Sequence, residues 1–211
     1  MAGREGPRGP YAKTAATRDR ILDAAEAVFA ENGFLASTVK QVAARAEISE
    51  RGLVHHFPSK SELLTGVLAR QEERTGADFP AQGDLRSLGA LIEQQKWLEK
   101  SPNTLELQAA LIAESTSPSH PAHAHFASRY EMLHQYVVTA FQSLADQGAL
   151  ESSLSPEDLA SGFVALSDGL HLQWLFNRDK PLPSGVLQRF LESIVPGLRS
   201  ATAPEEDAAT P

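Results

Sequence analysis

The segment SERGLVHHFPSK, residues 49–60, holds the side chains of this chain that are best suited to bind a polyanion. Arg51 and Lys60 carry fixed positive charges, His55 and His56 follow each other, and a serine opens the segment. An arginine can donate two parallel hydrogen bonds to a phosphate, or to the O6 and N7 atoms of a guanine. Because few apolar residues separate these groups, the segment predicts a short helix that presents polar side chains to a nucleic acid.

The residues around this segment supply the element that would position it. Two short helices are expected between Thr38 and Phe57, joined by a turn of about three residues at 46–48. This layout is typical of a helix-turn-helix, whose second helix enters the major groove of DNA. The apolar residues expected to lock the two helices together are Val42, Ala43, Ile48 and Leu53.

The first exposed turn of the second helix is where such a motif reaches the base edges. Glu50, Arg51 and Gly52 fall on this turn. We predict that Arg51 reads a guanine, while contact with a phosphate or with solvent alone is the alternative for this side chain. Gly52 has no side chain, so it is expected to allow a close approach to the DNA.

The charge distribution favours DNA as the partner of the N-terminal third. The whole chain has a formal net charge of -8, but residues 1–60 hold nine Lys or Arg against seven Asp or Glu, and residues 61–211 hold ten against twenty. Fields from surface charges are screened over about 8 to 10 Å at physiological salt. The local balance, and not the total, therefore decides which part can approach phosphates.

Apolar residues recur with a helical period along nearly the whole chain, and no stretch alternates convincingly with a period of two. The sequence therefore predicts an all-α protein of about nine helices. Gly33 is expected to end the first helix in a left-handed conformation, and Ser59 with Glu62 forms a capping box. The expected helices are 17–32, about two turns after Thr38, a third from Ser49, a fourth from Ser59, and then 84–100, 103–116, 121–148, 156–178 and 184–199.

Three stretches of the N-terminal third have a distinctive order and spacing: RILDAAEAVFAENGF at 20–34, STVKQVAARAEIS at 37–49 and ERGLVHHFPSKSELL at 50–64. Together they resemble the tetracycline-repressor (TetR) family of bacterial transcription regulators. SDGLHLQWLFNRD at 167–179 is similar to a segment near the end of many members. The resemblance implies an N-terminal three-helix DNA-binding domain, followed by a larger helical bundle that binds a ligand and forms dimers.

The resemblance also implies roles for single residues. Thr38 and Ser49 would bond to phosphates at helix N-termini, and Lys60 would grip the DNA backbone. His55 and His56 would flank the phosphate track, while the first exposed turn between them and Ser49 would face the bases. The candidate DNA-binding residues are Thr38, Lys40, Ser49, Glu50, Arg51, Gly52, His55, His56 and Lys60.

Two residues depart from the family pattern. Val54 occupies the position of a tyrosine that usually contacts phosphate, so this bond is expected to be absent. Glu47 replaces the usual glycine of the turn. If Glu47 has a positive φ angle, the strain costs on the order of 1 kcal/mol.

The expected domains are a disordered arm at 1–15, a helix-turn-helix domain at 16–60, a ligand-binding and dimerisation domain at 61–200 and a disordered tail at 201–211. Apolar stripes on the last two helices suit a four-helix interface between two chains, and ordinary core packing is the alternative. The candidate interface residues are Leu159, Phe163, Leu166, Leu170, Val186, Phe190 and Ile194.

The larger domain is expected to enclose a pocket for a small organic effector, lined by aromatic walls and a few polar anchors. Plain packing is again the alternative for each residue. The candidate lining residues are Trp97, Leu107, Leu111, Phe126, Tyr130, His134, Phe141, His171 and Trp174.

The sequence argues against several other classes. There is no cysteine, no run of about 18 apolar residues and none of the common catalytic motifs, so we expect no disulfide, no membrane span and no enzyme. His120, His123 and His125 lack the spacing of a metal site on a helix, and neither metal nor cofactor is predicted. A cytoplasmic location fits this composition.

The predicted function is a ligand-responsive transcriptional repressor that binds a palindromic double-stranded DNA operator as a homodimer. Two alternatives remain at this point: a DNA-binding protein without an effector, and an enzyme built on a helical fold.

Overall fold

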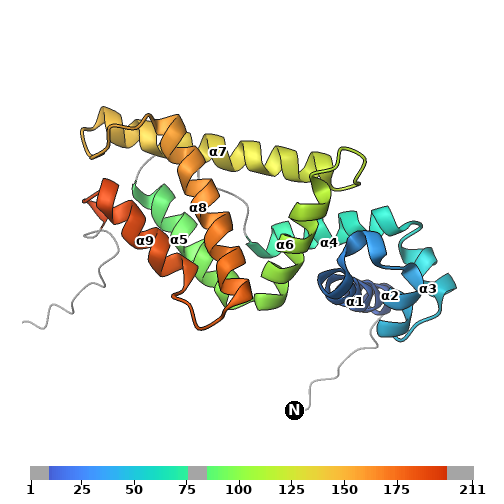
Figure 1. Ribbon diagram of the computed structural model, residues 1–211. Helices are drawn as coiled ribbons and strands as arrows, with labels where there is room; N and C mark the ends of the chain where they lie inside the picture. Colours follow the sequence, from blue (N-terminus) through green and yellow to red (C-terminus); the bar gives the residue numbers. More distant parts are fainter. Residues whose placement is uncertain (1–9, 76–84, 199–211) are drawn as a thin grey trace, which may run out of the picture. The chain divides into compact units, whose positions relative to one another are not determined.

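The computed structural model describes residues 10–75 and 85–198, with side chains described from residue 14 and not for residue 75. These residues form nine α-helices and no strand, which confirms the predicted all-α fold (Figure 1). The predicted arm falls mostly, and the predicted tail wholly, outside the described residues. The helices are α1 (Pro10–Ala36), α2 (Val39–Arg45), α3 (Glu50–His56), α4 (Lys60–Thr75), α5 (Leu85–Glu99), α6 (Pro102–Ser115), α7 (His123–Asp146), α8 (Pro156–Phe176) and α9 (Pro183–Ile194).

Helix α1 differs from its prediction at both ends. It begins at Pro10, before the expected start, and it runs to Ala36 through a kink at Gly33. Gly33 has φ 73° and ψ 166°, a conformation that is essentially restricted to glycine. The positive φ angle was expected, but the residue bends the helix where a simple C-cap was predicted.

The chain divides into two compact units. Unit 1 comprises Met1–Arg74 and Glu106–Ala124, and unit 2 comprises Thr75–Leu105 and His125–Pro211. Unit 1 therefore extends beyond residue 60, where the helix-turn-helix domain was expected to end. The reason is that α4 packs along α1: the Arg70 guanidinium bonds to the carboxylates of Asp23 and Glu26 at 2.8 and 2.7 Å.

The core of unit 1 joins α1 to the two short helices and to α4. Phe29, Leu53 and Phe57 are almost fully buried in it. Gly66 allows α4 to approach, because a Cβ atom there would overlap the Phe57 ring and press on Leu22. Burial of a side chain as large as Phe or Leu contributes about 1.5 to 3 kcal/mol, so this core holds helices that could not stand alone.

The turn between α2 and α3 is a Schellman motif. The Ile48 amide donates to the Ala43 carbonyl at 3.0 Å, and the Glu47 amide donates to the Ala44 carbonyl at 3.2 Å. Glu47 occupies the left-handed position of this motif with φ 56°, so the condition under which strain was expected at this residue is met. It is the one described residue other than glycine with a positive φ angle.

Unit 2 is a bundle of α5, α7, α8 and α9. Its core contains Leu91 from α5, Phe141 from α7, Phe163 from α8 and Leu191 from α9, each at most 1% exposed. Two polar contacts fix the ends of α9: Ser184 donates its amide and hydroxyl to the two carboxylate oxygens of Glu99, and the Ile194 carbonyl accepts from the Glu151 amide. Among the described helices, none combines the length and the hydropathy needed to traverse a bilayer.

Replacing Glu47 with glycine should stabilise the protein. Glu47→Gly removes the left-handed strain of an L-residue and is expected to raise the free energy of unfolding by about 1 kcal/mol, measured by urea denaturation. Glu47→Ala keeps the Cβ atom and should give no such gain. An equal gain in both variants would attribute the effect to the lost charge and contradict the strain.

Candidate nucleic-acid interface

Helices α2 and α3 are each seven residues long and are capped at their N-termini by side chains. The Thr38 hydroxyl accepts from the Gln41 amide at 3.2 Å, while the Gln41 side chain accepts from the Thr38 amide at 2.8 Å. The Ser49 hydroxyl accepts from the Gly52 amide at 3.0 Å. Each cap satisfies an amide that has no partner inside its helix and so defines where the helix begins.

One side chain decides which face of α3 is turned outward. Leu53 is fully buried, and Arg51 and His55 lie on the opposite side of the helix, one turn apart. Both are exposed, and Arg51 makes no ion pair with a described residue. A guanidinium and an imidazole on one exposed helix face can donate to phosphates or to base edges in a groove.

The hydroxyl groups of the two capping residues differ in whether they can donate a hydrogen bond to a phosphate. The Ser49 hydroxyl accepts from Gly52, so its own hydrogen can still be donated outward. The Thr38 hydroxyl already donates to Gln41 Oε1 at 2.9 Å and would have to rotate to reach a phosphate. Lys40 on α2 is exposed.

A contact within the chain favours glycine at position 52. A Cβ atom on Gly52 would lie 3.2 Å from the Ser49 hydroxyl oxygen, closer than side chains normally approach. The glycine therefore protects the cap of α3, in addition to the close approach to DNA that was predicted. Its neighbours Glu50 and Val54 are both exposed.

Lys60 opens α4, and its ammonium group is engaged within the chain. Its ammonium group donates to the carbonyl oxygens of Phe34, Leu35 and Ser37 at 2.9, 3.2 and 2.8 Å, and it lies 4.4 Å from the centre of the Phe34 ring. An ammonium group has three hydrogens, and all three are used here. These bonds tie α4 to the end of α1, and the predicted contact of Lys60 with the DNA backbone stays a prediction that would require breaking one of them.

His56 is also engaged within unit 1. Its carbonyl oxygen accepts from the Arg18 guanidinium at 3.4 Å, and this guanidinium lies 4.2 Å from the centre of the Phe57 ring. The His55 and His56 rings meet edge to face at 5.5 Å. Arg18 thus holds the end of α3 against α1, a role that no local pattern indicates.

The predicted effector residues have several different environments and do not all belong to unit 2. Phe141 is part of the core, and Leu107 and Leu111 belong to unit 1. The Tyr130 hydroxyl donates to Asp168 at 2.7 Å, and the His134 ring bonds to the Ser161 hydroxyl at 3.1 Å. Trp97 is half-buried, and Phe126, His171 and Trp174 are buried.

Three buried polar atoms of unit 2 have no hydrogen-bond partner among the described residues: Gln95 Oε1, His171 Nε2 and Trp174 Nε1. They lie at one end of the bundle. Gln95 is one turn from Glu99, which binds Ser184 at the start of α9, and α9 follows the end of α8 that carries His171 and Trp174. A buried polar group without a partner costs about 1 to 3 kcal/mol, so these atoms are suited to bind a ligand.

The charge states in this region follow from burial. Burial lowers the pKa of His171 to about 4, so the imidazole is neutral at pH 7. Burial also raises the pKa of Asp168, and the hydrogen bond from Tyr130 opposes part of this rise. Burial, followed by the hydrogen bond to Asp168, raises the pKa of Tyr130.

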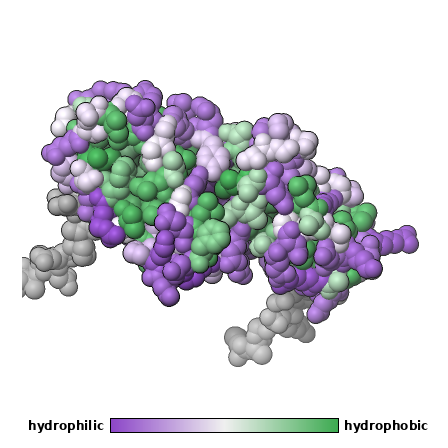
Figure 2. Space-filling view, viewed as in Figure 1, coloured by the Kyte–Doolittle hydropathy of each residue, from purple (hydrophilic) through white to green (hydrophobic). Residues whose placement is uncertain are grey.

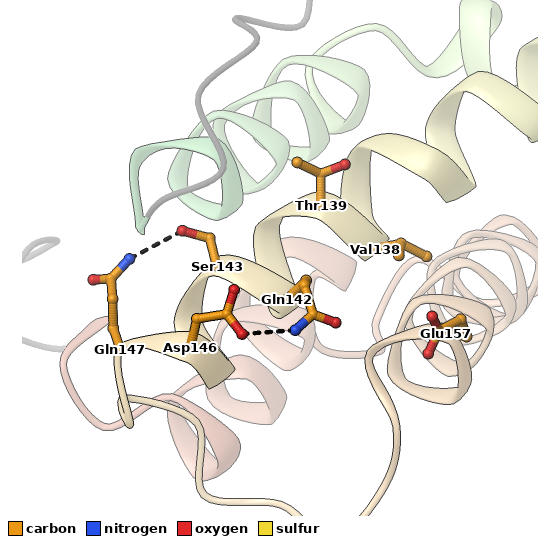
Figure 3. Close-up of a pocket in the computed structure, with 7 residues that line it drawn as sticks. All are labelled: Val138, Thr139, Gln142, Ser143, Asp146, Gln147 and Glu157. Atoms are coloured by element: carbon orange, nitrogen blue, oxygen red, sulfur yellow. Dashed lines mark hydrogen bonds between the residues drawn. The ribbon is translucent and has the colours of Figure 1, made fainter.

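A groove on the surface of unit 2 is less suited to bind a ligand. Figure 3 shows its lining by one side of α7, from Val138 to Asp146, by Gln147 directly after this helix and by Glu157 at the start of α8. Its polar groups bond to one another: Gln147 donates to Ser143 at 3.0 Å, and Gln142 donates to Asp146 at 2.8 Å. None of the effector candidates lines this groove.

The predicted dimer residues are divided between the core and its margin. Leu159 and Phe163 are at most 2% exposed and fill the core of a single chain, so they offer no surface to a partner. Leu166, Leu170, Phe190 and Ile194 are partly buried against that core, and Val186 is half-buried. On the face shown in Figure 2, apolar residues gather over the part of unit 2 that contains α8 and α9.

Comparison with known proteins agrees with this geometry. Residues 21–67 match the family "Bacterial regulatory proteins, tetR family", and residues 88–200 match "BetI-type transcriptional repressor, C-terminal". The second match alone covers more than half of the chain. The chain belongs to the TetR family of transcriptional regulators. The members of this TetR family act by binding DNA and not by catalysis.

One relative supports the same assignment by its sequence, and two solved structures share the fold. The HTH-type transcriptional regulator SrpR of Pseudomonas putida is 30% identical over 173 residues, which are 80% of this chain and 81% of SrpR. A TetR-family regulator from Agrobacterium tumefaciens has a similar fold, with a TM-score of 0.71, 22% identity and coverage of 86% and 99% of the two chains. A transcriptional regulator from Saccharomonospora viridis, solved in complex with choline, has a TM-score of 0.63, 23% identity and coverage of 86% and 98%.

Three histidines of this TetR-family protein, one before α7 and two in its first turn, make different contacts. The His120 ring meets Phe34 edge to face at 5.1 Å, His123 Nδ1 bonds to the Ser115 carbonyl at 2.8 Å, and the His125 ring meets its neighbour Phe126. The described residues contain no group of three or more potential metal ligands.

Removing the ammonium group of Lys60 should destabilise unit 1. Lys60→Met keeps most of the aliphatic chain but leaves three carbonyl oxygens without their donor, so it should lower the free energy of unfolding by about 1 to 3 kcal/mol in urea denaturation. Lys40→Met removes the same charge from an exposed position and should change stability by less than about 0.5 kcal/mol. Equal effects of the two substitutions would contradict the structural role of Lys60.

His171 should make the protein sensitive to mild acid. The pKa of His171 in the folded state lies below its unfolded value of 6.5. Between pH 6.5 and about 4 a proton therefore binds to His171 in the unfolded state but not in the folded state. Stability attributable to His171 is thus lost as pH falls, at up to about 1.4 kcal/mol per pH unit. Relative to His171→Gln, the wild type should lose stability across this window in urea denaturation.

Burial raises the pKa of Asp168, so the contribution of Asp168 to stability increases as pH falls, opposite to that of His171. Asp168 is present in both the wild type and His171→Gln, so its contribution largely cancels when the two are compared. Parallel stability curves for the wild type and His171→Gln would contradict a buried neutral imidazole.

Proposed function

We propose that this TetR-family protein is a dimeric repressor that binds a palindromic DNA operator and is released by a small organic effector. The observation that carries the DNA-binding part is the face of α3 opposite Leu53, where Arg51 and His55 are exposed on a helix fixed by a Schellman turn. In this proposal Arg51 contacts a base edge, and Ser49, Lys40 and His55 contact phosphates on either side.

A dimer is proposed because one seven-residue helix offers little contact. A single DNA-binding module typically buries about 600 to 1,000 Å², and a two-fold pair doubles that area while requiring two half-sites. The surface that supports this proposal lies on α8 and in the loop after it, where Leu172, Phe176 and Leu182 are 47%, 90% and 52% exposed. Gly162 and Gly169 of α8 border open space and would allow another helix to approach closely.

The effector is proposed to bind at the end of the unit 2 bundle that carries Gln95, His171 and Trp174. The indole N–H can donate, the amide oxygen can accept, and the neutral imidazole can do either according to its tautomer. The choline bound to the relative from Saccharomonospora viridis supports a small organic molecule as the ligand class.

Release would require only modest coupling between effector and operator. The effector is proposed to favour a separation of the two α3 helices of the dimer that does not fit the operator. A coupling free energy of about 1 to 3 kcal/mol between effector binding and DNA binding changes DNA affinity by about 5- to 150-fold. An effector that binds equally to the competent and incompetent arrangements would have no effect, however tightly it binds.

Operator binding by substituted proteins tests the division of roles. A palindrome selected from a pool of random duplexes is titrated at several salt concentrations, with fluorescence anisotropy as the readout. Arg51→Ala should reduce discrimination against a changed base pair by about 1 to 3 kcal/mol, because a base contact is lost. Lys40→Ala should weaken all duplexes alike and reduce the magnitude of the salt slope by about 1.

Lys96→Ala serves as the matched control, because Lys96 lies on α5 in unit 2 and pairs with Glu93. It should leave both quantities unchanged, and saturation should require two chains per palindrome. If the wild-type protein selects no palindrome at moderate salt, the proposed function is wrong. If Arg51→Ala and Lys40→Ala have the same effect on every duplex, the assigned roles are wrong.

A further inference from the structure

Residues 33–37, which are the end of α1 and the residue that follows it, are held by opposite charges from two sides. On the carbonyl side, Lys60 binds three oxygens of this segment. On the amide side, Glu114 accepts from the Phe34 amide at 2.9 Å and from the Leu35 amide at 3.2 Å. Charge-assisted hydrogen bonds of this kind are about twice as strong as neutral ones. The segment is therefore clamped between α4 and the end of α6.

Gly33 and Glu114 fit each other. The φ and ψ angles of Gly33 interrupt α1 and turn the next two amides toward the carboxylate. A Cβ atom at position 33 would overlap the Glu114 carboxylate group itself. The backbone angles thus favour a glycine here, and a Cβ atom would displace the carboxylate from the two amides, which links the kink in α1 to a residue of α6.

The position of Glu114 within its own helix is unfavourable. Glu114 lies in the last turn of α6, where the partial negative charge of the helix end disfavours a carboxylate. Its side chain is 22% exposed, so solvent offsets only part of this cost. The two amides that it accepts supply the compensation. An acidic residue at this place is hard to explain by the stability of α6 alone.

His120 and Lys60 are the other charged or titratable groups that face this contact. His120 Nδ1 accepts from the Ala122 amide at 3.2 Å, so in the neutral ring the proton is on Nε2, which lies 3.6 Å from Glu114 Oε2. The His120 ring also packs edge to face against Phe34. His120 thereby encloses the carboxylate and limits its movement away from the two amides.

Helix α6 begins at Pro102 in unit 2 and reaches Glu114 in unit 1. We propose that Glu114 is a positioning residue that fixes the helix-turn-helix to α6, and thereby sets the spacing at which two reading helices meet DNA. This proposal rests on the proposed DNA-binding function. Residue 37 is followed directly by Thr38, the cap of α2, so a shift of the clamped segment moves the start of the helix-turn-helix with it.

The spacing of operator half-sites provides a readout that a general loss of stability would not change. Wild-type protein should prefer its selected palindrome over a variant with one base pair inserted at the centre, because the two heads are held at a fixed separation. Glu114→Ala should reduce this preference by about tenfold, within the range typical of coupling between sites. Its affinity for a duplex with one half-site should stay the same.

Two further variants make the measurement specific. Glu114→Gln keeps one neutral acceptor oxygen and should lose less of the spacing preference than Glu114→Ala, which also covers the case in which alanine prevents folding. Glu106→Gln removes the same charge from an exposed position on α6 and should behave as wild type. A Glu114 variant that weakens every duplex by the same factor, or keeps the full spacing preference, overturns the positioning role.

Hydrogen exchange tests the contact without DNA. The amides of Phe34 and Leu35 should exchange at least about tenfold faster in Glu114→Ala than in wild type and Glu106→Gln, measured by NMR at one pH. Unchanged exchange would show that the carboxylate does not hold these amides and would overturn the proposal. If wild-type protein binds no duplex, the proposed function itself fails, and the exchange result then identifies Glu114 as structural only.

Discussion

The reading helix depends on burial of a few side chains, because α3 is too short to be stable alone. Isolated helices of fewer than about 12 residues are marginal in water, and α3 has seven residues. Leu53 and the following Phe57 are almost completely buried against α1 and α4, and Arg18 covers the end of the helix. This packing fixes the helix by one face and leaves Arg51 and His55 exposed on the other.

The charged side chains of unit 1 act over short distances, so a chain with a net charge of -8 can still present a basic surface to DNA. Several basic groups are consumed in building the unit: Arg70 pairs with carboxylates of α1, and Lys60 binds carbonyl oxygens beside Phe34. Arg51 and Lys40 remain exposed. The same principle applies to Glu114, whose charge serves the backbone of residues 33–37 and not the surface.

Local patterns in the sequence were sufficient to predict the order of the helices and several of their caps, but not all of their ends. Thr38 and Ser49 cap helices as expected, and Glu47 has the positive φ angle under which strain was expected. Contacts between distant residues could not be predicted in this way. Which helices become neighbours decides the hydrogen bonds that Lys60 and Glu114 make with residues beside Gly33. It also decides that Leu159 and Phe163 are buried in the core of one chain. Periodicity identifies an apolar face but not what covers it.

The most direct test of the account is amide hydrogen exchange of the whole protein with and without its selected operator. Protection should rise at the starts of α2 and α3 and across the exposed turn around Arg51, where the backbone would approach DNA. The amides of α7 should keep their free rates. Protection confined to α7, α8 or α9, with α3 unchanged, would contradict a reading helix held outward by unit 1.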